Sequence, residues 1–162
     1  MSLTSKNRIK ICLLAPSLEF IGGQSRQAVR LLTAFQAEAS LQVDFIPHDP
    51  RLPRPFLWLQ RIKYIRTFIT TLMYWTMLAL RLHRYDLIHI FSASYYSYLL
   101  SVAPAIIIGK LYGKKVILNY RSGEAEDHLQ HWPRTTVPVM KMADAIVVPS
   151  GYLVDVFARF GL

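Results

Sequence analysis

Five short apolar runs, each followed by a longer segment with helical spacing of its apolar residues, constrain the fold of this chain more than any other feature. Near-continuous apolar runs are typical of strands buried on both faces, as in a parallel sheet. Helical connections between parallel strands are right-handed and cover the faces of the sheet. The pattern predicts strands at 9–15, 41–46, 87–91, 115–119 and 145–148.

The segments between these runs predict the helices. Apolar residues recur at helical spacing after the first run and again over 57–84, 95–111 and 137–143, and Ser150 is expected to cap a last helix. Pro104 should bend the helix over 95–111, while 47–55 is expected to be irregular and 121–133 to be a polar loop. The chain is therefore predicted to be one α/β domain over 1–162, with a doubly wound, mainly parallel Rossmann-like sheet and helices on both faces.

Composition fits a globular domain. The chain has 162 residues, which is the size of one domain, and its 52% hydrophobic and 18% charged residues exclude intrinsic disorder. A single cysteine, Cys12, excludes an intrachain disulfide and favours a reducing, cytoplasmic setting. The apolar runs at 68–80 and 95–108 are shorter than the roughly 20 residues that span a bilayer. We interpret both as core helices, with contact to a membrane surface as the alternative.

The net charge of +9, from 19 Lys and Arg against 10 Asp and Glu, favours an anionic partner. Basic residues are mixed with aromatic ones between 51 and 66, a combination that suits an anionic membrane interface. The alternative is a solvated helix face above a core-packed stripe. No nucleic-acid-binding motif is present, so we expect no nucleic-acid partner. The residues in question are Arg51, Arg54, Phe56, Trp58, Arg61, Lys63, Tyr64 and Arg66.

Gly22 and Gly23 lie between the first predicted strand and the first predicted helix. Ligands of doubly wound sheets bind outside the carboxyl ends of the strands. Glycines allow close approach of the backbone, and the helix N-terminus behind them offers free N–H groups to a phosphate. The alternative is an ordinary tight turn, because the segment matches neither GxGxxG nor a Walker loop.

A second group of polar residues follows the fourth predicted strand. Arg121, Ser122 and Glu124 bring a cation, a hydroxyl and a carboxylate to the same edge, and such groups bind sugar hydroxyls or transfer protons. The alternative is a solvated acidic loop. His89, inside the third predicted strand, is a further candidate, although a histidine there is also typical of a satisfied core residue. The spacing of His128 and His131 matches no structural zinc pattern, so we expect no metal site.

Four segments together resemble a known enzyme family. They read KICLLAPSLEFIGGQSRQAVRLLTAF, YDLIHIFSASYYSYLL, KKVILNYRSGEAEDHL and ADAIVVPSGYLVDVFARFGL, and they cover nearly the whole chain. Their order resembles the N-terminal half of the group 1 (family 4) retaining glycosyltransferases. The resemblance rests on the double glycine, the Asp-x-Ile-His strand and the Ala-Asp-x-Ile-Val-x-x-Ser strand.

The resemblance implies a GT-B fold, in which an N-terminal domain binds the acceptor and a C-terminal domain binds the nucleotide-sugar donor. It places Gly22 and Gly23 near the donor phosphates, and the segment from Tyr120 to Glu124 near the acceptor. It also implies that no cofactor or bound metal is required, because protein cations and helix dipoles stabilise the leaving diphosphate. Two departures stand out. The donor-binding half lies outside residues 1–162, and Arg121 occupies the place where many members have a histidine.

These inferences combine into one expected function. We expect an acceptor-binding domain that helps to move a glycosyl group from a nucleotide sugar to a glycan or a lipid-linked acceptor, as in polysaccharide biosynthesis. It needs a donor-binding domain or subunit as partner and has little activity alone, and no catalytic residue is assigned. The residues expected to bind substrate are Gly22, Gly23, His89, Arg121, Ser122 and Glu124.

The alternative function is a non-catalytic module that binds an anionic membrane surface, such as the inner face of the membrane, or a protein partner. A nicotinamide-dependent oxidoreductase is disfavoured because the glycine fingerprint is missing.

Overall fold

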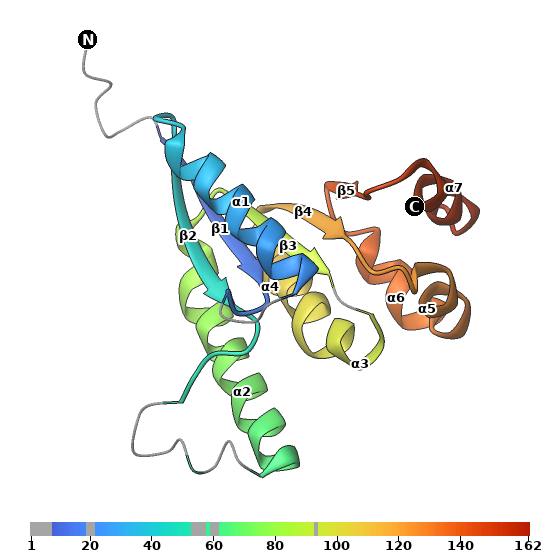
Figure 1. Ribbon diagram of the computed structural model, residues 1–162, viewed down its shortest axis with the longest axis horizontal. Helices are drawn as coiled ribbons and strands as arrows, with labels where there is room; N and C mark the ends of the chain where they lie inside the picture. Colours follow the sequence, from blue (N-terminus) through green and yellow to red (C-terminus); the bar gives the residue numbers. More distant parts are fainter. Residues whose placement is uncertain (1–7, 19–21, 53–57, 59–61, 93) are drawn as a thin grey trace.

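The computed structural model describes residues 8–18, 22–52, 58, 62–92 and 94–162, and Figure 1 shows their arrangement. Five parallel strands form one sheet in the order β2-β1-β3-β4-β5. All five predicted strands are confirmed, with bounds that differ from the prediction by no more than one residue. The strands are β1 (Ile9–Ala15), β2 (Leu41–Pro47), β3 (Leu87–Ser92), β4 (Lys115–Tyr120) and β5 (Ala145–Val147).

Helices cover both faces of the sheet, so the predicted doubly wound α/β fold is confirmed. Helix α1 (Gly23–Ala37) packs on one face, where Ala28 contacts a small cluster that includes Leu13 and Phe91. The opposite face carries the large core, in which alternate strand residues such as Leu14 and Leu118 meet the remaining helices. That layer contains α2 (Lys63–Arg81), α4 (Ala103–Leu111), α6 (Pro133–Met140) and α7 (Gly151–Arg159).

The helix predicted over 57–84 is shorter at its start. Helix α2 begins at Lys63 and continues into a 3-10 turn, η3 (Leu82–Arg84). Residues 57 and 59–61 of the predicted helix, and 53–55 of the predicted irregular segment, lie outside the described residues. In Figure 1 the first turns of α2 (green) extend past the carboxyl ends of the strands. Within the described residues, no helix combines the length and the apolar character needed to cross a membrane.

The predicted polar loop over 121–133 was wrong, because α5 (Ala125–His131) occupies its centre. Ala125, His128 and Leu129 are all buried, and their spacing puts them on one helical face. Glu126 and Asp127 lie in the first turn, where carboxylates interact favourably with the helix dipole. The apolar pattern of this segment does not predict a helix, because its inward face includes a histidine in place of an aliphatic side chain.

The helix predicted over 95–111 changes its hydrogen-bonding type just before Pro104. Residues 95–111 form α3 (Tyr95–Ser97), a π-helical segment η4 (Tyr98–Val102) and α4. Proline has no N–H, so Pro104 leaves the carbonyl of Leu100 without its usual helical donor. The indole Nε1 of Trp75 donates to that carbonyl at 2.8 Å. Trp75 of α2 therefore supplies the bond that Pro104 withholds and ties the two helices together.

Two helix ends follow their sequence signals. Ser150 caps α7, since its Oγ accepts from the N–H of Leu153 at 3.4 Å. Gly113 follows α4 with φ of 66°, a left-handed conformation in which glycine has no steric penalty.

Candidate functional site

The carboxyl ends of all five strands lie along one edge of the sheet, called the carboxyl rim here. The chain moves outward in one direction from β1 to β2 and in the other direction from β3 through β4 to β5. The reversal creates a switch point between β1 and β3, where doubly wound sheets bind ligands. The turn with Gly22 and Gly23 follows β1, and the loop that begins at Arg121 follows β4. These two segments share the rim two strands apart, roughly 10 Å at the usual strand spacing.

The start of α1 is fixed to both neighbouring strands. Gln24 Nε2 donates to the carbonyl of Ser92 at the end of β3 at 3.1 Å. Ser25 Oγ donates to the carbonyl of Ser17 at 3.1 Å, and the N–H of Ser17 donates to Asp49 Oδ1, beyond β2, at 2.9 Å. Three side chains that sequence reasoning did not single out therefore tie the start of α1 to the segments that follow the neighbouring strands.

Nothing within the described residues requires glycine at positions 22 and 23. Gly22 has an extended backbone with φ of −138°, and a Cβ added at Gly22 or Gly23 meets nothing within 4 Å. Helix α1 has no acidic residue in its first turn and no side-chain cap from Gly22. The first N–H groups of a helix have no intrahelical partner and attract anions. Among the described residues, nothing within 4 Å of a Cβ at these two positions blocks the approach of a phosphate to the start of α1.

Arg121, Asn119 and His89 form a hydrogen-bonded line that starts at the carboxyl rim. Arg121 Nε donates to Asn119 Oδ1 at 2.9 Å, so the Asn119 amide nitrogen faces His89 Nε2 at 3.2 Å. Arginine only donates, which fixes the orientation of the amide and makes His89 Nε2 the acceptor. His89 is therefore neutral, with its proton on Nδ1.

His89 lies in the middle of β3 and below the rim. It is 7% exposed, and the ring of Phe35 on α1 packs edge-on against it, with 6.1 Å between the ring centroids. Burial, with a smaller contribution from the positive charge of Arg121, lowers the pKa of His89 from 6.5 to about 4. His89 itself does not lie at the rim. It is linked to the rim by hydrogen bonds through Asn119 to Arg121, and so it helps to position Arg121. Asn119 could have been recognised from the sequence, because it is an amide inside an apolar strand and lies on the same face of the sheet as His89.

Ser122 and Glu124 lie at the start of the α5 segment. Ser122 Oγ accepts from the N–H of Glu124 at 3.3 Å, and the Glu124 side chain is exposed. Tyr95, which follows β3 with a φ of 55°, donates its hydroxyl to Asp127. A left-handed conformation is uncommon for a tyrosine, and such backbone occurs preferentially at functional sites. The loop after β4 is therefore braced against the segment after β3.

His128 is the centre of a buried polar network behind this loop. Its Nδ1 lies 3.1 Å from the hydroxyl of Tyr120 and its Nε2 lies 3.3 Å from Thr136 Oγ1. The Tyr120 hydroxyl also bonds to Ser94 Oγ at 2.9 Å. Burial lowers the pKa of His128, which favours the neutral ring. With both nitrogens engaged inside the domain, His128 has a structural role that sequence reasoning missed.

Two other kinds of site receive no support from the geometry. Across the part of the chain that the structure describes, no three histidine, cysteine or acidic side chains gather as metal ligands. Cys12 is fully buried, and its burial raises the pKa of the thiol to about 12, so it is not a thiolate nucleophile.

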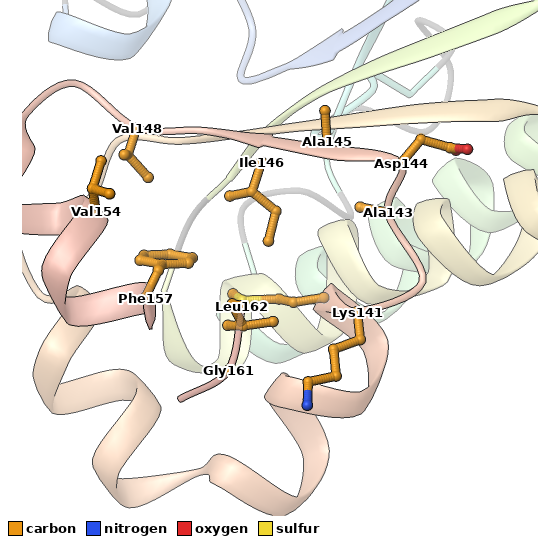
Figure 2. A pocket seen from close by; sticks show the side chains of 11 residues that line it. Lys141, Ala143, Asp144, Ala145, Ile146, Val148, Val154, Phe157, Gly161 and Leu162 are labelled. Carbon is orange, nitrogen blue, oxygen red and sulfur yellow. The ribbon is translucent and has the colours of Figure 1, made fainter. Parts of the chain in front are cut away.

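A pocket lies at the outer edge of the sheet, away from the predicted site residues. It has a volume of about 380 Å³ between β5, the end of α6 and α7. Figure 2 shows that apolar side chains dominate its wall, among them Ile146, Val148, Val154, Phe157 and Leu162. It contains none of the six predicted binding residues, and its apolar lining does not suit a sugar phosphate.

The strand order and the residues at the carboxyl rim define a doubly wound α/β domain with polar side chains along that rim. No protein-family model matches this chain, and no curated protein matches it. Among solved structures, a conserved protein from Enterococcus faecalis V583 is similar, with 12% sequence identity and a TM-score of 0.45. The match covers 93% of this chain and 99% of that one. The strand order of the sheet by itself defines the doubly wound fold.

Proposed function

We propose that this chain is the acceptor-binding domain of a glycosyltransferase, and that it works with a donor-binding domain or subunit. The observation that carries the proposal is the shared rim, where the open helix end behind Gly23 and the cation of Arg121 flank the switch point. Two positive groups at that spacing suit the phosphates of a nucleotide sugar. The sequence resemblance to retaining glycosyltransferases supports the same reaction class.

In this function the chain positions substrate and carries no assigned catalytic group. Gly22 and Gly23 let the diphosphate approach the N–H groups of α1, while Arg121, permanently charged, clamps an anionic oxygen. Ser122 and Glu124 hydrogen-bond the hydroxyl groups of a glycan or lipid-linked acceptor. His89 stays neutral and holds Asn119, which in turn orients the Arg121 guanidinium.

Binding of inorganic diphosphate tests this proposal on the chain alone. In ¹⁵N-labelled protein the amide signals of Gly23 and Gln24 are expected to shift on titration. Arg121→Gln should weaken binding about tenfold, because one charge-assisted contact is lost. Arg30→Gln, at an exposed site further along α1, is the matched control and should bind as the wild type does. Equal affinities in all three proteins, or no shift at the start of α1, would contradict the proposal.

Sugar transfer itself is tested by pairing. The chain is mixed with a donor-binding α/β domain, and turnover of a nucleotide sugar is measured with glycan and lipid-linked acceptors. Turnover that requires both halves supports the assignment. Absence of turnover in every pairing and in any longer product of the same gene counts against it.

A second candidate function is contact with an anionic membrane surface at the inner face of the membrane. The observation that favours it is the charge of the segment between Asp49 and Asp86, which has seven Lys or Arg and no Asp or Glu. Such segments bind anionic lipid headgroups. The two functions are compatible when the acceptor is attached to a lipid.

A further inference from the structure

Helix α2 carries two apolar stripes, and only one of them faces the core. Tyr74 and Leu78 are fully buried against the sheet. A second stripe points to solvent at the helical spacing of three and four residues. It consists of Ile65, Phe68, Leu72 and Trp75, with exposed fractions of 40%, 70%, 55% and 40%. An amphipathic helix on a core needs one apolar stripe, so the second, called the outer stripe here, is not explained by folding.

The outer stripe begins where α2 extends beyond the sheet. The 19 residues of α2 span roughly 28 Å, whereas the seven residues of β2 span roughly 23 Å. The C-terminal end of α2 leads directly to the start of β3, so the excess length lies at the carboxyl rim (Figure 1). Tyr64 and Ile65 in this extension are exposed, and Phe68 follows one turn later with its side chain also exposed. The stripe thus starts beside the candidate ligand edge.

The charge of the sequence segment that contains the outer stripe identifies the kind of surface that it fits. No Asp or Glu occurs between Asp49 and Asp86, so nothing in this segment repels an anionic surface. Arg66 is exposed on the first turn of α2. Basic side chains beside exposed aromatic and aliphatic ones are the signature of a helix lying in an anionic membrane interface. The Lys and Arg of this segment are Arg51, Arg54, Arg61, Lys63, Arg66, Arg81 and Arg84.

Polar groups beside the outer stripe already have partners inside the protein. Thr70 Oγ1 donates to the carbonyl of Arg66 at 2.7 Å, and Thr76 Oγ1 donates to that of Leu72 at 2.8 Å. The Trp75 indole N–H is bonded to Leu100. Transfer of a polar group from water is costly only when its hydrogen bond is lost. These three groups keep theirs, so the cost of covering this side of α2 with lipid is small.

We propose that the outer stripe of α2 inserts into the interface of an anionic lipid bilayer and holds the carboxyl rim beside the membrane. The inference extends the proposed membrane contact and does not depend on sugar transfer. A second copy of the chain fits less well, because a two-fold interface would set each basic segment against itself. Nucleic acid fits the cations but has no use for four exposed apolar side chains in a row.

The test is co-sedimentation of the full chain with vesicles of phosphatidylcholine alone or mixed with phosphatidylglycerol. The wild type is expected to bind the mixed vesicles and to release at high salt, because salt screens the headgroup charge. A Phe68→Ser, Leu72→Ser double variant should bind at least about tenfold more weakly, because two apolar side chains no longer enter the lipid. Arg66→Glu should weaken binding about tenfold and only to the anionic vesicles.

Val29→Ser is the matched control, since Val29 is 41% exposed on α1, which covers the opposite face of the sheet. It should bind vesicles as the wild type does. Circular dichroism melts verify that all variants are folded, which is expected because the changed side chains are exposed. Failure of the wild type to bind anionic vesicles, or equal losses in the control, overturns the inference. A change of oligomeric state in the double variant, measured by light scattering without vesicles, also overturns it, because the stripe is then a protein interface.

Discussion

The two faces of the sheet differ in what covers them and in what they carry. On one face Ile90 and Leu118 are fully buried in the large core beneath the layer that holds α2, α4, α6 and α7. On the other face α1 covers a small cluster, and the neighbouring strand positions are His89 and Asn119. Apolar burial on the first face stabilises the domain. The hydrogen-bonded line on the second face runs from the middle of β3 to the carboxyl rim. The residues that stabilise the domain and those of the candidate site therefore lie on opposite faces of the same strands.

The largest expected effect is on the large core. Leu118→Ala should lower the free energy of unfolding by about 3 kcal/mol, because it removes buried methyl groups and leaves a cavity. Its neighbour Ile117 points to the other face and is half-buried, so Ile117→Ala should cost about 1 kcal/mol. Urea unfolding of both variants measures the difference. Equal losses would show that the two faces contribute alike.

A second effect is the dependence of stability on pH. The folded-state pKa of His89, about 4, lies below its ordinary value of 6.5, so the unfolded chain binds the proton more readily. The stabilisation is present above about pH 6.5 and is lost as the pH falls toward 4, by about 2 kcal/mol. His89→Gln, which keeps an acceptor for Asn119, should flatten this slope in urea midpoints measured across that range. The pH dependence that remains in this variant comes from His48 and His128, whose pKa values burial also lowers.

The control for this slope is Gln36→Ala, since Gln36 is exposed on α1 and has no titratable group. Its pH dependence should follow that of the wild type. If the pH slope of stability in His89→Gln were the same as in the wild type, burial would not keep His89 unprotonated in the folded protein, and the prediction would be wrong.

A smaller effect is expected from breaking the polar line at its centre. Asn119→Ala leaves His89 Nε2 and Arg121 Nε without their partner and should cost about 1–2 kcal/mol. Ser40→Ala, which removes an exposed hydrogen bond to Glu38, should cost almost nothing. Thermal melts of the two variants compare a buried bond with an exposed one. If Asn119→Ala did not change the melting temperature, water would be replacing the amide without cost.

The smallest effect on stability is expected at the glycine turn. Gly23→Ala meets open space and a backbone that is not left-handed, so the melting temperature should stay the same or rise slightly. Gly113→Ala, where φ is 66°, should cost about 1 kcal/mol. Under the proposed function Gly23→Ala nevertheless weakens diphosphate binding. A large loss of stability at position 23 would mean that the turn itself requires glycine.

Two aspartates of the motifs that carry the family resemblance have structural roles at the far edge of the sheet. Asp86 Oδ2 accepts from the N–H of Lys10 at 2.9 Å, at the amino end of β3. Asp144, before β5, accepts from Lys110 Nζ at 2.8 Å, and these bonds hold its pKa below its usual range. The resemblance at these positions therefore reflects how strands are joined, and the candidate site lies at the opposite edge of the sheet.

Local pattern determined the parallel sheet of this protein, because buried strands and amphipathic helices repeat their apolar residues with different periods. The strands and the cap at Ser150 follow from neighbouring residues alone. Only the tertiary structure decided that Asn119 links His89 to Arg121, that His128 is enclosed, and that Trp75 bonds the carbonyl freed by Pro104. Each of those contacts joins side chains whose distance and orientation depend on strand order and helix packing, which no local periodicity encodes.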